Sequence, residues 1–267
     1  MTIQISKPTI MGVLNITPDS FSDGGQHFDT DKAIESAKLM ISQGADIIDV
    51  GGESTRPGAQ SVSISDEINR VIPVIEALHH STDVTISIDT SKPEVMKLAV
   101  EAGASIVNDV CALSGDSALE TAAMLNVDVC LMHMQGSPRT MQKDPIYNDV
   151  VDDIKDFFSQ RIEACIAAGI TEDKIILDPG FGFGKTLGHN LEILKRFHEF
   201  KSFRLPLLAG LSRKSMIGTL LDDRNVDGRI IGSVTGAIIA VQNGADIVRV
   251  HDVLETKDAL TILGGVS

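Results

Sequence analysis

Short apolar segments alternate with longer segments of helical periodicity along almost the whole chain. The apolar segments predict eight strands, at residues 9–17, 46–52, 85–90, 105–110, 128–134, 175–180, 207–212 and 246–252. The segments that follow them predict helices at about residues 31–43, 66–79, 92–102, 117–126, 150–168, 189–200, 228–243 and 253–263. Eight strand–helix units predict an α/β protein with the (β/α)8 TIM barrel fold, and a doubly wound open sheet is the alternative. No domain boundary is visible, so we expect a single domain over residues 1–267.

Three segments of the chain repeat one order of residues. QGADIIDV, AGASIVND and NGADIVRV each place Gly-Ala at the end of a predicted helix, with an apolar strand directly after it. Five residues after the glycine of each copy stand Asp49, Asn108 and Arg249. The repeat therefore puts a polar side chain at an equivalent point late in three strands, which a repeat of core residues alone would not require.

Polar residues stand at the carboxyl end of nearly every predicted strand. They are Asn15, Asp49, Asp89, Asn108, His133, Asp178, Arg213, Lys214, Arg249 and His251. Ligands bind beyond the carboxyl ends of the strands in both the barrel and the open sheet, so we expect one pocket there. The long loops at about 18–29 and 53–65 follow the first two strands and are rich in Gly, Ser and Pro, which predicts mobile lids.

Some of these groups indicate the kind of ligand. Asp89, Asn108 and Asp178 are rich in hydrogen-bond acceptors, which together suit a planar heterocycle with several N–H donors. Arg249 and His251 stand two apart in a strand, so their side chains point to the same face and could hold an anion there. Each residue taken alone could equally be a structural polar group.

Two further segments bear on anion and metal binding. LSRKSMIG (211–218) places cationic and hydroxyl groups at a predicted helix start, which favours an anion or a carboxylate over a plain helix cap. Asn15 could contribute to a Mg²⁺ site if a substrate phosphate supplied other ligands. The spacing of the Cys and His residues does not match a zinc site.

The segment PGFGFGKT (179–186) ends in Gly-Lys-Thr after a strand, yet it matches neither common nucleotide motif. Pro179 stands where the phosphate-binding loop needs Gly, and Leu187 stands where the dinucleotide fingerprint needs its last Gly. We expect these glycines to allow a tight turn that presents Phe183 at the pocket rim.

Composition excludes some partners. The net charge of −14 and the isoelectric point near 4.8 argue against nucleic acid, whose phosphates are bound by Lys and Arg. The first residues lack the pattern of a signal peptide, and the longest apolar stretch is too short to span a membrane. The three cysteines have no metal-type spacing and are expected to be reduced thiols. We therefore expect a cytoplasmic protein without membrane partners.

The chain resembles the dihydropteroate synthase family at MGVLNITPDSFSDGG (11–25). The resemblance continues in order through GGESTRPGA, SIDTSKPEV, IVNDV, MHMQGSPRTMQ, LDPGFGFGK, LSRKS and VRVHD, from the first predicted strand to the last. It implies a transferase of folate biosynthesis that condenses 6-hydroxymethyl-7,8-dihydropterin pyrophosphate with p-aminobenzoate, giving 7,8-dihydropteroate and pyrophosphate. Sulfonamides, which imitate p-aminobenzoate, would be its inhibitors.

The resemblance also implies roles for individual residues. The pterin would be held by Asp89, Asn108, Asp178 and Lys214. The pyrophosphate would be held by Asn15, Arg249 and His251, with Mg²⁺ as cofactor on Asn15. The p-aminobenzoate would lie near Phe21, Thr55, Arg56, Pro57, Phe183, Lys214 and Ser215. The family mechanism is dissociative: pyrophosphate leaves first, and the arylamine then attacks a pterin methylene cation, with Asp89, Asp178, Lys214, Arg249 and His251 as catalytic residues.

Two other functions remain open from the sequence. Related barrels transfer a methyl group from a folate, but that reaction has no pyrophosphate for Arg249 and His251 to bind. A non-catalytic pterin-binding paralogue is the second alternative, against which the intact loops and anion site argue. The resemblance further implies a homodimer, for which the apolar helix GRIIGSVTGAIIAV is our candidate contact surface.

Overall fold

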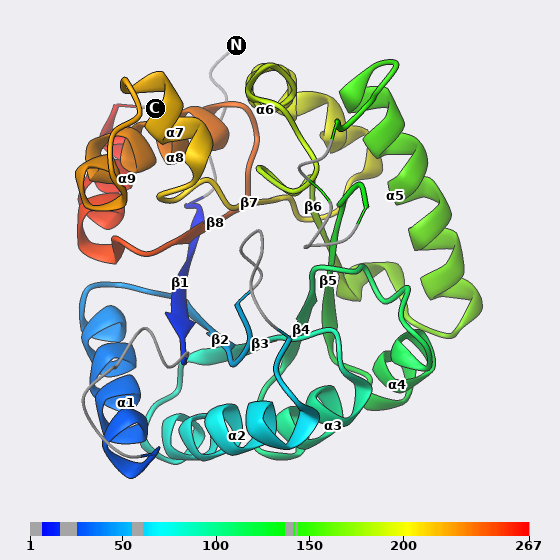
Figure 1. The fold of residues 1–267 in the computed structure, drawn as a ribbon, viewed down its shortest axis with the longest axis vertical. Coiled ribbons are helices and arrows are strands. Elements are labelled where there is room, and N and C mark those ends of the chain that lie inside the picture. The colour runs from blue at the N-terminus through cyan, green and yellow to red at the C-terminus, as the bar shows by residue number, and fades with distance from the viewer. Residues whose placement is uncertain (1–6, 17–25, 55–60, 137–140, 142–143, 267) are drawn as a thin grey trace.

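A ring of parallel strands surrounded by helices forms the fold of this computed structural model (Figure 1). The structure describes residues 7–16, 26–54, 61–136, 141 and 144–266, without the side chains of residues 26–29. The strands are β1 (Thr9–Asn15), β2 (Ile47–Gly51), β3 (Thr85–Asp89), β4 (Ile106–Asp109), β5 (Asp128–Met132), β6 (Ile175–Asp178), β7 (Leu208–Ala209) and β8 (Ile247–Val250). The helices are α1 (Gln26–Ser42), α2 (Ile64–Ser81), α3 (Pro93–Glu101), α4 (Ala118–Leu125), α5 (Val150–Ala167), α6 (Leu187–Lys195), α7 (Ser215–Leu220), α8 (Ile230–Gln242) and α9 (Val253–Gly265).

The eight strands follow the order β6-β5-β4-β3-β2-β1-β8-β7, with every pair parallel. The two ends of this order meet where Leu177 of β6 forms a parallel bridge with Leu207, next to β7. The Leu177 amide donates to the Pro206 carbonyl at 2.9 Å. This contact brings the sheet almost to closure and confirms the predicted TIM barrel over the open sheet.

The predicted helix stops at the repeated Gly-Ala pairs are confirmed. Gly44, Gly103 and Gly244 have φ angles of 101°, 121° and 103°, a left-handed conformation that glycine adopts without strain. Each of them ends a helix directly before an interior strand.

The structure departs from the predicted elements around β7. The predicted helix at 189–200 is two elements, because α6 ends at Lys195 and a 3-10 helix covers Phe197–Phe203. The predicted strand at 207–212 is shortened to the two residues of β7, and the helix start predicted within 211–218 is confirmed as α7, which has six residues. Hydrophobic patterns identify long elements better than short ones, and this part of the barrel is built from short ones.

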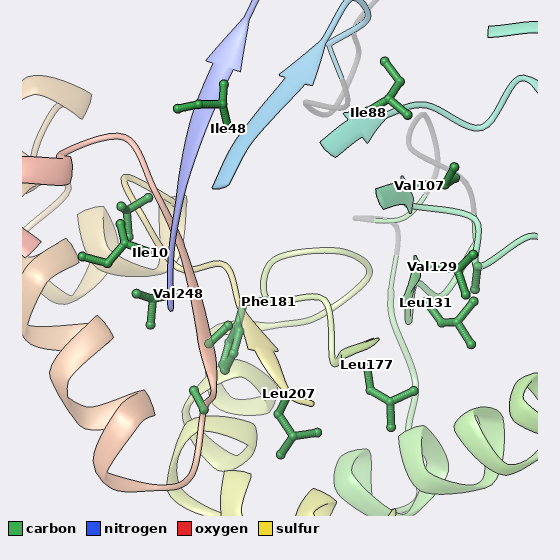
Figure 2. Close-up of a cluster of buried hydrophobic side chains, with 14 of the residues drawn as sticks. Ile10, Ile48, Ile88, Val107, Val129, Leu131, Leu177, Phe181, Leu207 and Val248 are labelled. Atoms are coloured by element: carbon green, nitrogen blue, oxygen red, sulfur yellow. The ribbon is translucent and has the colours of Figure 1, made fainter. Parts of the chain in front are cut away.

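Successive residues of the strands face two different apolar layers. Ile10, Ile48, Val107, Leu177 and Val248 belong to the outer core between strands and helices (Figure 2). Their neighbours along the strands form a separate cluster inside the barrel, made of Met11, Ile47, Ile106, Cys130, Ile176, Leu208 and Ile247. This alternation is the two-residue period of a strand, and it fixes which side chains point to the barrel axis.

Two further observations concern the sequence-based expectations. Among the described residues, no helix is long and apolar enough to cross a membrane. Cys111, Cys130 and Cys165 are free thiols, and the latter two are buried.

Candidate active site

A polar layer lies inside the barrel, directly above the apolar cluster. The even-numbered strands β2, β4, β6 and β8 each carry an isoleucine that faces the barrel interior: Ile47, Ile106, Ile176 and Ile247. Two residues further along each strand, the side chain that faces the interior is polar. These side chains belong to Asp49, Asn108, Asp178 and Arg249. Alternate strands of a TIM barrel supply four side chains to each interior layer, so the four share one level near the carboxyl ends.

Arg249 lies at the centre of this layer and pairs with two carboxylates. Its Nε is 2.6 Å from Oδ2 of Asp49, and its Nη2 is 2.8 Å from Oδ2 of Asp89. The carboxylates are 0% and 8% exposed, so each would be costly to keep ionised without a cation. The single positive charge of the guanidinium offsets one of the two negative charges, and its contacts with both carboxylates fix their relative positions.

Asp49 contacts two members of this layer, although the sequence-based assignment of ligand contacts omitted it. Its Oδ2 also accepts a hydrogen bond of 3.1 Å from the amide nitrogen of Asn108. This bond uses one of the two N–H groups of Asn108 and orients the amide, whose carbonyl oxygen could accept from a ligand. The repeat had marked Asp49 as equivalent to Asn108 and Arg249, which is the signal that could have included it.

Burial controls the protonation of the two carboxylates that we expect to bind the ligand. It raises the pKa of Asp89 to about 7, against the opposing effect of Arg249. Burial also raises the pKa of Asp178, while Lys214 and the Gly180 amide favour its ionised form. The Gly180 amide donates to Oδ1 of Asp178 at 2.7 Å. Both carboxylates therefore respond to the charge of whatever occupies the pocket.

Lys214 precedes α7 and lies against the turn after β6. Its Nζ donates to the Phe181 carbonyl at 2.5 Å and stands 4.6 Å from the centre of the Phe183 ring. Desolvation lowers the pKa of Lys214 to about 8, partly opposed by Asp178. The predicted tight turn at 179–186 therefore does bring Phe183 to the site, next to this ammonium group.

His251 follows β8 and is held by Ser212. The Ser212 hydroxyl lies 3.1 Å from Nδ1 of His251 and accepts the backbone amide of the same residue, also at 3.1 Å. Arg213 points elsewhere, because it forms an ion pair of 2.5 Å with Asp252. The run at 211–218 therefore contributes its serine and lysine to the site, while its arginine has a structural partner.

Asn15 ends β1 beside Gly51. A side chain at Gly51 would meet both the Asn15 amide oxygen and Asp89, at 3.5 and 3.6 Å from its Cβ. Within the described part of the chain, no group of three His, Cys, Asp or Glu side chains could hold a metal ion. One amide oxygen fits Mg²⁺ only if phosphate oxygens of a ligand complete the coordination.

Some of the expected p-aminobenzoate contacts cannot be placed. Phe21, Thr55, Arg56 and Pro57 lie outside the described residues. Ser215 opens α7 with its side chain exposed, next to Lys214.

A concavity of about 700 Å³ lies at the opposite end of the barrel. Two of its acidic residues have backbone partners: Asp46 accepts the Ile10 amide at 2.9 Å, and Asp246 accepts the Leu207 amide at 2.8 Å. These two aspartates occupy equivalent positions in two copies of the repeat. Each one forms a hydrogen bond with the backbone of a neighbouring segment, which is a structural role.

Comparison with known proteins agrees with this geometry. The model of the pterin binding enzyme family matches residues 11–251. The chain therefore belongs to the family of pterin-binding enzymes.

The relatives within this family define a narrower group. The dihydropteroate synthase of Escherichia coli K12 is 53% identical over 262 residues, which are 98% of this chain and 93% of the relative. The crystal structure of the Yersinia pestis dihydropteroate synthase with a sulfonamide drug is 52% identical, with a TM-score of 0.94 over 100% of this chain and 96% of the other. The Xanthomonas albilineans enzyme in complex with 7,8-dihydropteroate is 42% identical, with a TM-score of 0.90 over 100% and 95%. The chain groups with the dihydropteroate synthases, which are transferases.

Proposed function

We propose that the polar layer and the residues around it carry out the dihydropteroate synthase reaction in this chain. The substrates are 6-hydroxymethyl-7,8-dihydropterin pyrophosphate and p-aminobenzoate, and the products are 7,8-dihydropteroate and pyrophosphate. The observation that carries this proposal is the buried arrangement of Asp49, Asp89 and Arg249, with Asn108 hydrogen-bonded to Asp49. It combines acceptors for a heterocycle with a cation for an anionic leaving group.

The pterin would bind to Asp89, Asn108, Asp178 and Lys214. The two carboxylates and the Asn108 carbonyl accept from the N–H groups of the pterin edge, whereas the Lys214 ammonium donates to an acceptor of the ring. Burial of these groups supports the assignment, because hydrogen bonds inside a water-poor site discriminate strongly against ligands that leave them unpaired.

The pyrophosphate would bind to Asn15, Arg249 and His251. Arg249 uses Nε and Nη2 for its two carboxylates, so Nη1 is the nitrogen that takes part in neither ion pair. His251 is held at Nδ1 by Ser212, which favours the use of Nε2 toward a ligand. Mg²⁺ held between Asn15 and the phosphate oxygens would neutralise charge on the leaving group.

The p-aminobenzoate would lie against Phe183, Lys214 and Ser215, together with Phe21, Thr55, Arg56 and Pro57. Phe183 offers a ring face and Lys214 an ammonium group to an aromatic carboxylate. The same contacts would serve a sulfonamide.

The reaction is expected to be dissociative. As pyrophosphate departs, Arg249 and His251 stabilise its growing negative charge, while Asp89 and Asp178 stabilise the positive charge left on the pterin. The amine of p-aminobenzoate then attacks the exocyclic methylene carbon and loses a proton. The loops at about 18–29 and 53–65 would exclude water from this intermediate.

Three features of the whole molecule belong to the same proposal. We expect one domain and a homodimer, for which α8 offers an apolar face with Ile231 80% exposed and Ile239 38% exposed. The free cysteines favour a reducing compartment, and we propose the cytoplasm. Sedimentation of the purified chain would test the dimer.

The experiment that tests the function measures pyrophosphate release and dihydropteroate formation by the purified chain with Mg²⁺. We expect both products in equal amounts, inhibition by a sulfonamide that p-aminobenzoate relieves, and loss of turnover when a chelator removes the metal. Pterin binding without pyrophosphate release would instead indicate a pterin-binding protein that is not a synthase.

A further inference from the structure

The buried Lys185 has no role in the proposed reaction, although it lies next to the site. Its side chain is 3% exposed, at the end of the turn between β6 and α6. Its Nζ is 3.0 Å from Nδ1 of His133, 3.2 Å from the His133 carbonyl and 3.0 Å from the Phe183 carbonyl. Desolvation lowers the pKa of Lys185 well below its usual value, and Asp178 opposes this shift. The three acceptors match the three N–H groups of an ammonium ion, so these contacts stabilise the charged form against burial.

His133 is suited to accept from Lys185. Burial, reinforced by the neighbouring ammonium group, lowers the pKa of His133 to about 2, so its ring is neutral at physiological pH. Its ring also packs edge-on against Phe157, with centroids 4.9 Å apart. The acceptor is therefore fixed in place at the end of β5.

The turn from Gly180 to Gly184 is pressed against the same segment of the chain. Both glycines have positive φ angles, of 70° and 63°. A Cβ would come within 2.0 Å of the His133 carbonyl oxygen at Gly180 and within 2.5 Å of the Gln135 carbonyl oxygen at Gly184. Glycine is therefore needed at both positions, and Lys185 is the side chain that bonds the turn to β5.

The same turn also contacts Lys214. The Phe181 carbonyl accepts from Lys214, and the Phe183 ring lies under the same ammonium group. The Phe183 carbonyl accepts from Lys185. Two lysines thus donate to backbone carbonyls of one short turn, Lys185 to that of Phe183 and Lys214 to that of Phe181.

We propose that Lys185 is a positioning residue, which bonds the 180–186 turn to His133 and thereby holds Lys214 in its ligand-binding position. This inference rests on the proposed function, which assigns Lys214 to the pterin. It gives the Gly-Lys-Thr sequence after β6 a role that is not nucleotide binding.

The test measures the dissociation constant of a fluorescent pterin for the full chain and its variants. We expect Lys185→Met to raise this constant about tenfold. A tenfold change in affinity corresponds to the free energy of about one hydrogen bond that orders the site. In a Lys214→Met background the same change should have less than about a twofold effect, because residues that act through one another are not additive. Lys195→Met, at the exposed end of α6, is the matched control and should leave binding unchanged.

A second pair of variants keeps the test decisive if Lys185→Met folds poorly. His133→Asn retains an acceptor for Lys185 and should bind the pterin nearly as well as the native chain, whereas His133→Leu should weaken binding about as much as Lys185→Met. Equal effects of Lys185→Met in both Lys214 backgrounds, or no difference between the two His133 variants, would overturn the inference. A native chain that binds no pterin would refute the proposed function itself. An unchanged constant in Lys214→Met would refute the assignment of Lys214, and with it this inference, but not the proposed reaction.

Discussion

Arg249 and Asp49 are 200 positions apart in the chain, yet Nε of the first lies 2.6 Å from Oδ2 of the second. The parallel register explains this contact, because β1 pairs with both β2 and β8 and brings the two strands to either side of it. Asp89 on β3 completes the group at 2.8 Å. The cation proposed to receive the leaving pyrophosphate is therefore held by two carboxylates, one of which is proposed to bind the pterin.

Replacing Arg249 with lysine tests the geometry of this pair. Lysine keeps the charge but loses the planar fork, so it cannot contact both carboxylates as arginine does. We expect kcat/KM to fall by about 10–100-fold. Steady-state kinetics would measure the fall, with Arg196→Lys as control because Arg196 follows α6 and pairs with the partly exposed Asp149, outside the polar layer. Equal effects of the two substitutions would argue against a role for the Arg249 fork.

Asp49→Asn tests the contribution of the buried pairing to stability. The change removes one of the two negative charges around Arg249 at a position that is 0% exposed. We expect the free energy of unfolding to fall by about 2 kcal/mol, since the change replaces a buried hydrogen bond between two charged groups with a weaker one, while Asp89 still pairs with Arg249. Denaturant titration would measure it.

The control for Asp49→Asn is Asp152→Asn. Asp152 is 61% exposed and 3.6 Å from Lys155, so its loss should cost less than about 1 kcal/mol. A similar small effect for Asp49→Asn would mean that the ion pair does not hold the site together.

The pH dependence of pterin binding should have two limbs. Asp89, with its pKa raised to about 7, gains a proton as the pH falls through that value and then no longer accepts from the ligand or balances Arg249. Lys214, with its pKa lowered to about 8, loses its charge as the pH rises through that value. We therefore expect the tightest binding between about pH 7 and pH 8.

Fluorescence titration of the pterin at each pH would measure these limbs. Lys214→Arg should move the alkaline limb upward, because a guanidinium group stays protonated. An acid limb near pH 4 would show that Asp89 has the pKa of an ordinary aspartate.

Ser212→Ala tests how His251 is oriented. The change removes the hydroxyl that contacts both Nδ1 and the backbone amide of His251. We expect KM for the pterin pyrophosphate to rise about 5–10-fold. This is the range for the loss of one hydrogen bond to His251, the residue proposed to bind the negatively charged pyrophosphate. The affinity for a pterin without pyrophosphate should stay unchanged.

Ser159→Ala is the control for this substitution, since its exposed hydroxyl donates to the Lys155 carbonyl within α5. If Ser212→Ala weakened both pterin ligands to the same extent, its effect would be on the pocket as a whole and not on His251.

The strand and helix pattern was sufficient to predict the barrel and the end at which the polar layer lies. Alternating apolar runs and glycine helix stops are local signals, and Gly44, Gly103 and Gly244 adopt the expected conformation. The elements around β7 were predicted only with other bounds, as a strand at 207–212 and a helix start within 211–218, because two strand residues and six helix residues carry little periodicity.

The sequence by itself determined the polar residues that end the strands, since each one lies beside the apolar run that identifies its strand. Only the tertiary structure decided how these residues pair. Asp49 joins Arg249 and Asn108, Arg213 turns to Asp252, and Lys185 bonds to His133 through contacts between distant segments. The physical reason is that strand periodicity sets the face on which a side chain lies, whereas barrel closure sets which faces meet.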